Sequence, residues 1–166
     1  MNRLQTAWLR EQLQHGQEAD LVRRRAIIAC SLLGIASMSA ATLFQTGIIK
    51  HLPDPPLPSF DADKVNSSHL AYRLGAPDGP LAVLDFAANL PLAAFGGIRR
   101  SPWIALLAGG KAGMDMLGGA YYFSLMPRKE KAWCLYCILA TLAEAAVLAL
   151  ALPEMGRAFK TVSRTR

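Results

Sequence analysis

Two cysteines close together in the sequence are the residues best suited to chemistry. The segment Trp133-Cys-Leu-Tyr-Cys137 places two thiols at positions i and i+3. On a helix this spacing puts both side chains on one face, within reach of a disulfide. An apolar run follows, so we expect the pair to open a helix, where unpaired N–H groups and the helix dipole favour the Cys134 thiolate. The pair predicts dithiol–disulfide chemistry, with plain packing of two small apolar residues as the alternative.

Other uses of cysteine fit this sequence less well. Structural zinc needs four ligands, but the third cysteine, Cys30, is remote and the three histidines form no ligand pattern, so no metal is expected. Covalent haem attachment needs a histidine directly after the second cysteine, and Ile138 stands there. Cys30 lies near the far end of another apolar run, and we expect it to be a small packing residue.

Long apolar runs predict the elements that must position the pair. Apolar residues make up 52% of the chain and charged residues 18%, against roughly 25% charged residues in soluble domains. A membrane-spanning helix needs about 20 apolar residues, and the first run carries no charged residue. We therefore expect an all-α integral membrane protein, a four-helix bundle with a long exterior loop between its first two helices. The predicted spans are residues 26–49, 81–98, 102–126 and 133–152.

The flanking segments predict the orientation. The net charge of +6 is concentrated in short basic groups beside apolar runs, such as Arg23-Arg24-Arg25 and Arg99-Arg100. Such groups meet anionic headgroups and stay on the cytoplasmic side, so nucleic acid is not an expected partner. Residues 1–25 are predicted to form a cytoplasmic segment with a helix at the membrane interface, or else a solvated helix. Residues 153–166 are expected to be a cytoplasmic basic tail.

Both termini are thus predicted to be cytoplasmic, in a bacterial inner membrane that the chain crosses several times. The proline-rich loop of residues 50–80 would be exterior, on the side where dithiol oxidation is sustained. The basic segment Arg128-Lys-Glu-Lys131 would also lie outside, against the general trend.

Ionisable residues also lie inside the predicted spans. At the centre of a span each charge costs roughly 2.5–3.5 kcal/mol, so each needs a partner or a function. Lys111 and Glu144 both fall near the predicted midplane. We expect them to face each other or to share a polar interior, with Lys111 and Asp115 at i and i+4 as the competing pair.

The cysteine pair opening a fourth helix after a long exterior loop resembles the vitamin K epoxide reductase family. The loop adds Ser67-Ser68 and Gly75-Ala-Pro77, which are similar to the family's serine pair and Gly-x-Pro before the second span. The resemblance covers roughly residues 26–152. It implies a four-helix bundle around a quinone, of ubiquinone or menaquinone type, with electrons passing from protein thiols to that quinone.

The resemblance also implies roles for single residues. Cys134 would exchange with the dithiol of an exterior thioredoxin-like partner, and Cys137 would face the quinone ring. Ser67 and Ser68 would help to shape the loop over the site. Thr141 stands at a ring-contacting position that is often tyrosine in the family, and it would bind the quinone by a hydrogen bond without stacking.

Quinone reduction also consumes protons. Asp85 and Asp115 fall near the predicted depth of Cys137, so they are candidates for proton supply.

One departure from the family leaves two alternative functions open. Family members carry a second cysteine pair in the first loop, but this loop has no cysteine, and Ala62 stands near the expected place of the second one. The chain thus resembles a divergent bacterial branch. We expect a membrane quinone-linked thiol–disulfide oxidoreductase, and the alternative is a non-catalytic membrane subunit of the same fold that binds quinone, lipid or a larger complex.

Overall fold

The computed structural model describes residues 3–98 and 100–164, and every regular element in them is helical. The prediction of an all-α chain is therefore confirmed. A 3₁₀ turn, η1 (His69–Tyr72), and a π-helical turn, η2 (Met126–Glu130), accompany the α-helices. The α-helices are α1 (Arg3–His15), α2 (Ala19–Gln45), α3 (Ala62–Asn66), α4 (Asp78–Ala94), α5 (Pro102–Leu125) and α6 (Leu135–Arg164).

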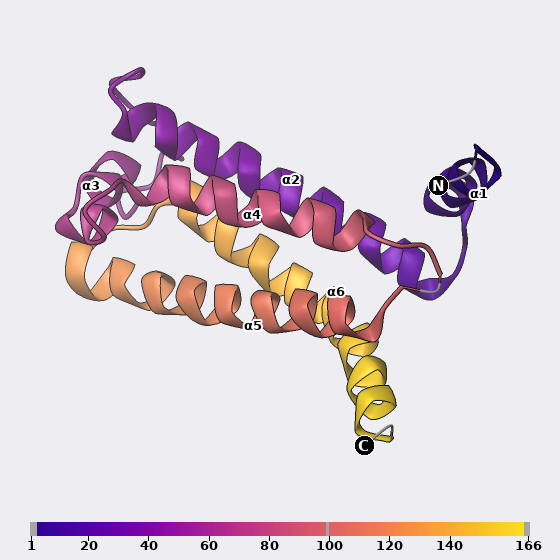
Figure 1. The fold of residues 1–166 in the computed structure, drawn as a ribbon. Coiled ribbons are helices and arrows are strands. Elements are labelled where there is room, and N and C mark those ends of the chain that lie inside the picture. The colour runs from indigo at the N-terminus through magenta and orange to yellow at the C-terminus, as the bar shows by residue number, and fades with distance from the viewer. Residues whose placement is uncertain (1–2, 99, 165–166) are drawn as a thin grey trace.

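Four long helices lie side by side (Figure 1). Helix α2 packs along both α4 and α6, and α5 packs along α6, whereas α4 and α5 touch each other only sparsely. Helices α2 and α6 are long and apolar enough to cross a membrane, whereas α4 has only 17 residues. By length and composition, α2 and α6 therefore qualify as membrane spans among the four predicted ones.

Two helix boundaries differ most from the predicted spans. The first long helix begins at Ala19, because arginine is a good helix former and Arg23–Arg25 continue the helix instead of preceding it. The last helix does not end before Pro153 but continues to Arg164, bending on the way (Figure 1). Proline has a helix-compatible φ and can be tolerated at such a bend. The predicted tail of residues 153–166 is thus helical over its described part.

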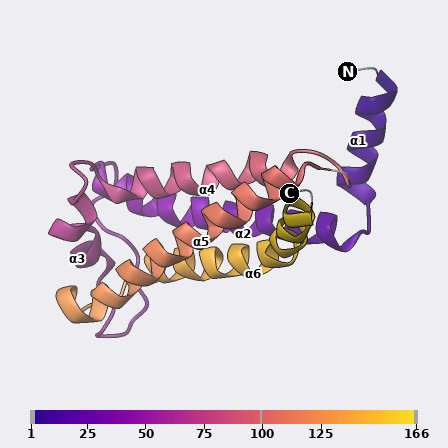
Figure 2. The ribbon, with the colours of Figure 1, turned by 60° about the horizontal axis from the view of Figure 1, so that its bottom comes forward.

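The remaining boundaries lie close to expectation. Helix α5 spans Pro102–Leu125, and its proline occupies the first helical position after Ser101. Helix α4 ends at Ala94, and Gly96 follows with a φ of 75°, a left-handed conformation that glycine adopts without strain. Helix α1 stands apart from the four long helices, with Leu4 and Trp8 exposed (Figure 2).

Helix α2 approaches α4 closely through one small residue. The ring of Phe86 on α4 is 1% exposed and covers Gly34 on α2. A methyl group at Gly34 would lie 2.5 Å from this ring, so the helices can meet at this distance only without a side chain there.

The end of the bundle farthest from the cysteine pair is held by three charged residues, which we call the arginine clamp: Arg24, Arg100 and Glu154. Arg100 donates from Nε to Glu154 Oε1 and from an Nη to Oε2, both at 2.7 Å. Arg24 also pairs with both carboxylate oxygens and donates to the carbonyl of Gly97 at 3.0 Å. The clamp joins α2, the α4–α5 turn and α6. Arg99, another positive charge used to predict the orientation, lies outside the described residues.

Candidate functional site

Cys134 and Cys137 form a disulfide at the start of α6, with their Cα atoms 5.3 Å apart. Cys134 directly precedes the helix, which begins at Leu135. The backbone N–H of Cys137 donates to Cys134 Sγ at 3.1 Å, so the sulfur occupies the place of an N-capping oxygen. The same N–H group would stabilise a Cys134 thiolate after reduction.

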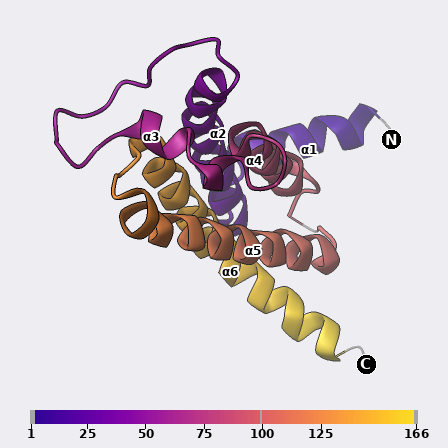
Figure 3. The same ribbon diagram turned by 90° about the vertical axis from the view of Figure 1, so that its left-hand side faces the viewer.

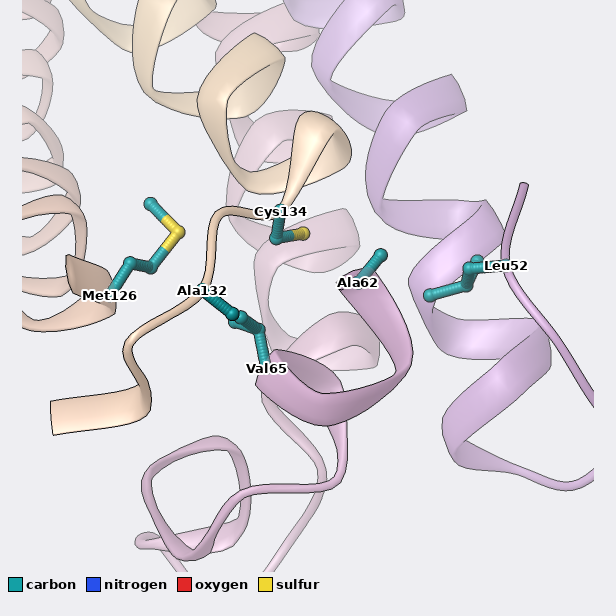
Figure 4. Packing of buried hydrophobic residues seen from close by; sticks show 6 residues of the cluster. All are labelled: Leu52, Ala62, Val65, Met126, Ala132 and Cys134. Atoms are coloured by element: carbon teal, nitrogen blue, oxygen red, sulfur yellow. The ribbon is translucent and has the colours of Figure 1, made fainter. Parts of the chain in front are cut away.

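The segment between α2 and α4, residues 46–77, covers the disulfide, and we call it the cap. Figure 3 looks onto this end and shows α3 near the start of α6. Cys134 is completely buried, in a cluster with Leu52, Ala62 and Val65 of the cap and with Met126 and Ala132 (Figure 4). Cys134 is therefore unreachable for another protein while the cap is in this position.

Two backbone hydrogen bonds fasten the cap to the segment before α6. The N–H of Asp61 donates to the carbonyl of Trp133 at 3.0 Å, and the N–H of Trp133 donates to the carbonyl of Ser59 at 2.8 Å. The side chain of Asp63 also orders the cap, because it accepts from the N–H of Leu52 at 2.7 Å and pairs with His51 at 2.8 Å.

Asn66 is a site residue that sequence reasoning missed. Its side chain is 2% exposed, and Nδ2 donates to the carbonyl of Ala62 at 2.8 Å and to Cys134 Sγ at 3.4 Å. Asn66 adjoins the serine pair in the sequence, but nothing there indicated contact with a residue 68 positions away. Burial of an amide against sulfur becomes visible only when the cap is folded.

The two predicted loop serines differ in position. Ser68 accepts a hydrogen bond from the N–H of Ala71 at 3.4 Å and so caps η1, and it lines a cavity beneath the cap. Ser67 ends α3 through its backbone, with an exposed side chain. Both contribute to local turns of the cap.

A cavity of about 420 Å³ lies between the cap, α4, α5 and α6. Its walls are mostly apolar, and they include Leu81, Phe123 and Cys137. The disulfide thus has two different sides: Cys134 lies under the cap, and Cys137 faces the cavity. The sparse contact between α4 and α5 leaves the cavity partly open.

The model of one protein family, the vitamin K epoxide reductase family, matches residues 25–152. The chain belongs to this family. Membership indicates a membrane-embedded thiol–disulfide oxidoreductase, in agreement with the disulfide at the start of α6. No curated protein matches the chain in the comparison.

In this family member, Ala62 is in contact with the disulfide cluster. Its side chain is fully buried beside Cys134, where a loop cysteine was expected (Figure 4). Thr141, which was predicted to bind the quinone, lines the cavity, and its hydroxyl donates to the carbonyl of Cys137 at 2.9 Å. That hydroxyl proton is therefore engaged within α6.

The buried charges pair differently from our first expectation. Lys111 Nζ lies 2.6 Å from Asp115 Oδ2, the competing partner, and 2.9 Å from Asp85 Oδ1. Glu144 does not take up this pairing, because Asp85 reaches Lys111 from α4 and, together with Asp115, neutralises it. Asp85, Asp115 and Glu144 all line the cavity, and Lys111, which we expected to share a polar interior with Glu144, is linked to the cavity wall through its two aspartate partners.

Cys30 lies far from this site. It is a free cysteine on α2 that packs against a cluster including Ile27, Ala112 and Val147, toward the arginine clamp. Its position agrees with the packing role predicted for it.

Proposed function

We propose that this protein is a quinone-linked thiol–disulfide oxidoreductase that oxidises an exterior dithiol and reduces a quinone. The observation that carries the proposal is the two-sided disulfide, with Cys134 under the cap and Cys137 on an apolar cavity. An apolar cavity with a few polar groups suits a quinone ring, whether of ubiquinone or menaquinone type. Thr141 would contact the ring, and polar groups of the cavity with a free donor would orient it.

The chemistry follows from thiol–disulfide exchange. A thiolate of the donor attacks Cys134 Sγ, a mixed disulfide forms, and Cys137 leaves as a thiolate in the cavity. The second donor thiol then resolves the mixed disulfide and leaves Cys134 reduced. The reduced pair passes two electrons to the quinone, the Cys134–Cys137 disulfide re-forms, and the quinone takes up two protons to become a hydroquinone.

Burial of Cys134 sets a condition on the donor. Because the loop lacks a relay cysteine, a thioredoxin-like protein would have to attack Cys134 directly. The cap would then have to lift, which breaks the two backbone hydrogen bonds at Trp133 and exposes Leu52 and Val65. The donor itself would stabilise the lifted cap by binding the exposed surface.

The arrangement in the membrane is also part of this proposal. The long helices α2, α4, α5 and α6 would form four spans in a bacterial inner membrane, with both termini cytoplasmic and the cap exterior. The short α4 would span a locally thinned bilayer. Exposed Leu4 and Trp8 on α1 support an interfacial position for this helix.

A second candidate function is a non-catalytic membrane subunit of the same fold. It is favoured by the complete burial of Cys134 and by Ala62 in place of a relay cysteine. In that case the disulfide would only stabilise the start of α6, and the cavity would bind a quinone or lipid without turnover.

Anaerobic quinone reduction by the purified protein in lipid vesicles tests the proposal. Dithiothreitol serves as the donor and a short-chain ubiquinone or menaquinone as the acceptor, followed by quinone absorbance. We expect turnover in the wild type, loss of turnover in Cys134→Ser and Cys137→Ser, and retention in the matched control Cys30→Ser. Absence of turnover, even with a thioredoxin-like protein as donor, would favour the non-catalytic subunit.

A further inference from the structure

Glu144 has an unusual position in the cavity. It lies two turns after Cys137 on α6, and both residues line the cavity together with Thr141 between them. Its Oε2 atom is buried and has no hydrogen-bond partner among the described residues. Unpartnered buried polar atoms are rare in folded proteins, and they call for a functional explanation.

The charges around Glu144 do not neutralise it. From α5 and α4, Asp115 and Asp85 both pair with Lys111, so two carboxylates already face a single cation. The other titratable groups on the cavity wall are Asp78, Tyr122 and Glu130, none of which is a cation. A proton on the Glu144 carboxyl is what removes its charge in this apolar setting, and it turns the group into a hydrogen-bond donor.

We propose that Glu144 carries this proton and donates it to the quinone oxygen in the cavity, acting as the general acid of the reaction. This inference rests on the proposed function. When the reduced pair gives two electrons to the quinone, one of the two protons taken up comes from Glu144 and the other from the thiol of Cys137. Cys134 enters this step as the thiolate left by the exchange, so it gives up no proton. The Cys137 thiolate takes up a proton after the exchange, and Glu144 regains one through the open side of the cavity, so both protons of the hydroquinone are accounted for.

Gly119 on α5 leaves room for the carboxyl of Glu144. A methyl group added to Gly119 would overlap Glu144 Oε2, so the absence of a side chain there makes room for the acid. In contrast, a methyl group at Gly113 on the same helix would meet nothing within 4 Å. Gly119→Ala therefore displaces the carboxyl without changing its chemistry, and Gly113→Ala is its matched control.

The test separates electron transfer from thiol exchange. Protein reduced with dithiothreitol is mixed with a short-chain ubiquinone, and re-formation of the disulfide is followed. We expect Glu144→Gln to slow this step by about 100-fold, the usual scale of a general acid, and Gly119→Ala to slow it clearly more than Gly113→Ala. Reduction of the disulfide by dithiothreitol alone is expected to proceed at the wild-type rate in all three variants.

Infrared spectroscopy provides a second readout that needs no turnover. A carboxylic-acid C=O band in the oxidised protein should disappear in Glu144→Gln and persist in Asp85→Asn. If the wild type reduces quinone and Glu144→Gln does so at the same rate, the role of Glu144 is wrong while the proposed function stands. If the wild type does not reduce quinone, both fail. Should Glu144→Gln not fold, equal rates in the two glycine variants would overturn the inference.

Discussion

The two ends of the bundle treat polar groups in opposite ways. In the arginine clamp, Glu154 meets two guanidinium groups, and the remaining donors of Arg24 and Arg100 reach backbone carbonyls. At the disulfide end, the Oε2 atom of Glu144 has no hydrogen-bond partner among the described residues, and Glu144 lines a cavity next to a disulfide whose Cys134 sulfur lies buried under the cap.

This difference indicates that one end mainly stabilises the fold and the other is available for chemistry. Buried charges that are completely paired fix the positions of the helices they join, and losing one partner is costly. Incompletely satisfied groups beside a cavity have capacity left for a ligand or a proton. The arginine clamp is thus expected to govern unfolding, whereas changes at the disulfide end should alter reactivity more than global stability.

The largest effect should come from Glu154→Gln. The substitution leaves Arg24 and Arg100 buried without a countercharge, and we expect the free energy of unfolding to fall by about 3–5 kcal/mol. Denaturant titration in detergent micelles measures this loss. Asp20→Asn, which removes partly exposed ion pairs with Arg23 and Arg157, is the control and should cost less than about 1 kcal/mol. Equal losses would mean that the buried clamp contributes no more than a partly exposed ion pair.

Leu52→Ala should loosen the cap. Leu52 is 5% exposed in the cluster around Cys134, and truncation of a buried leucine costs about 2–5 kcal/mol. Part of this cost should favour the lifted cap, and we expect labelling of reduced Cys134 by a maleimide to accelerate about tenfold or more. Leu57→Ala, at a leucine that is 54% exposed in the same cap, should leave the labelling rate near wild type. Unchanged labelling in both would mean that the cap does not control access.

The two aspartates that pair with Lys111 should contribute unequally to stability. The Asp115 side chain is 10% exposed and that of Asp85, on the cavity wall, is 41% exposed, so the second pair is less buried. We expect Asp115→Asn to lower the free energy of unfolding by about 1–2 kcal/mol and Asp85→Asn by less than about 1 kcal/mol. Quinone-reduction rates of both variants between about pH 5 and 8 also test whether either aspartate supplies protons, as predicted from the sequence; unchanged rates would exclude it.

The smallest effect should come from Asn66→Ala. Loss of the Nδ2 donor removes a long hydrogen bond to Cys134 Sγ, and we expect iodoacetamide to alkylate reduced Cys134 about fivefold more slowly at neutral pH. Ser67→Ala, in the neighbouring residue with an exposed side chain, serves as the control. Faster alkylation in Asn66→Ala would mean that the amide holds the cap closed more than it stabilises the thiolate.

Local sequence signals predicted much of the helical structure. The long apolar runs indicated where the four long helices lie, and Ser101-Pro102 indicated the start of α5. Signals for where a helix ends were less reliable, because the end depends on several weak contributions. Pro153 suggested a helix end, but packing and good helix formers around it carry α6 onward to Arg164.

Within the candidate site, too, local features were predictable from the sequence and long-range contacts were not. The i, i+3 spacing of Cys134 and Cys137 determined that they could form a disulfide at a helix start, because this geometry is local. Contacts between distant segments followed from packing instead: Asn66 against Cys134, Ala62 in the buried cluster, and Asp85 with Lys111. Such contacts depend on how the cap and four helices share one interior, and neither apolar patterning nor residue spacing along the chain contains that information.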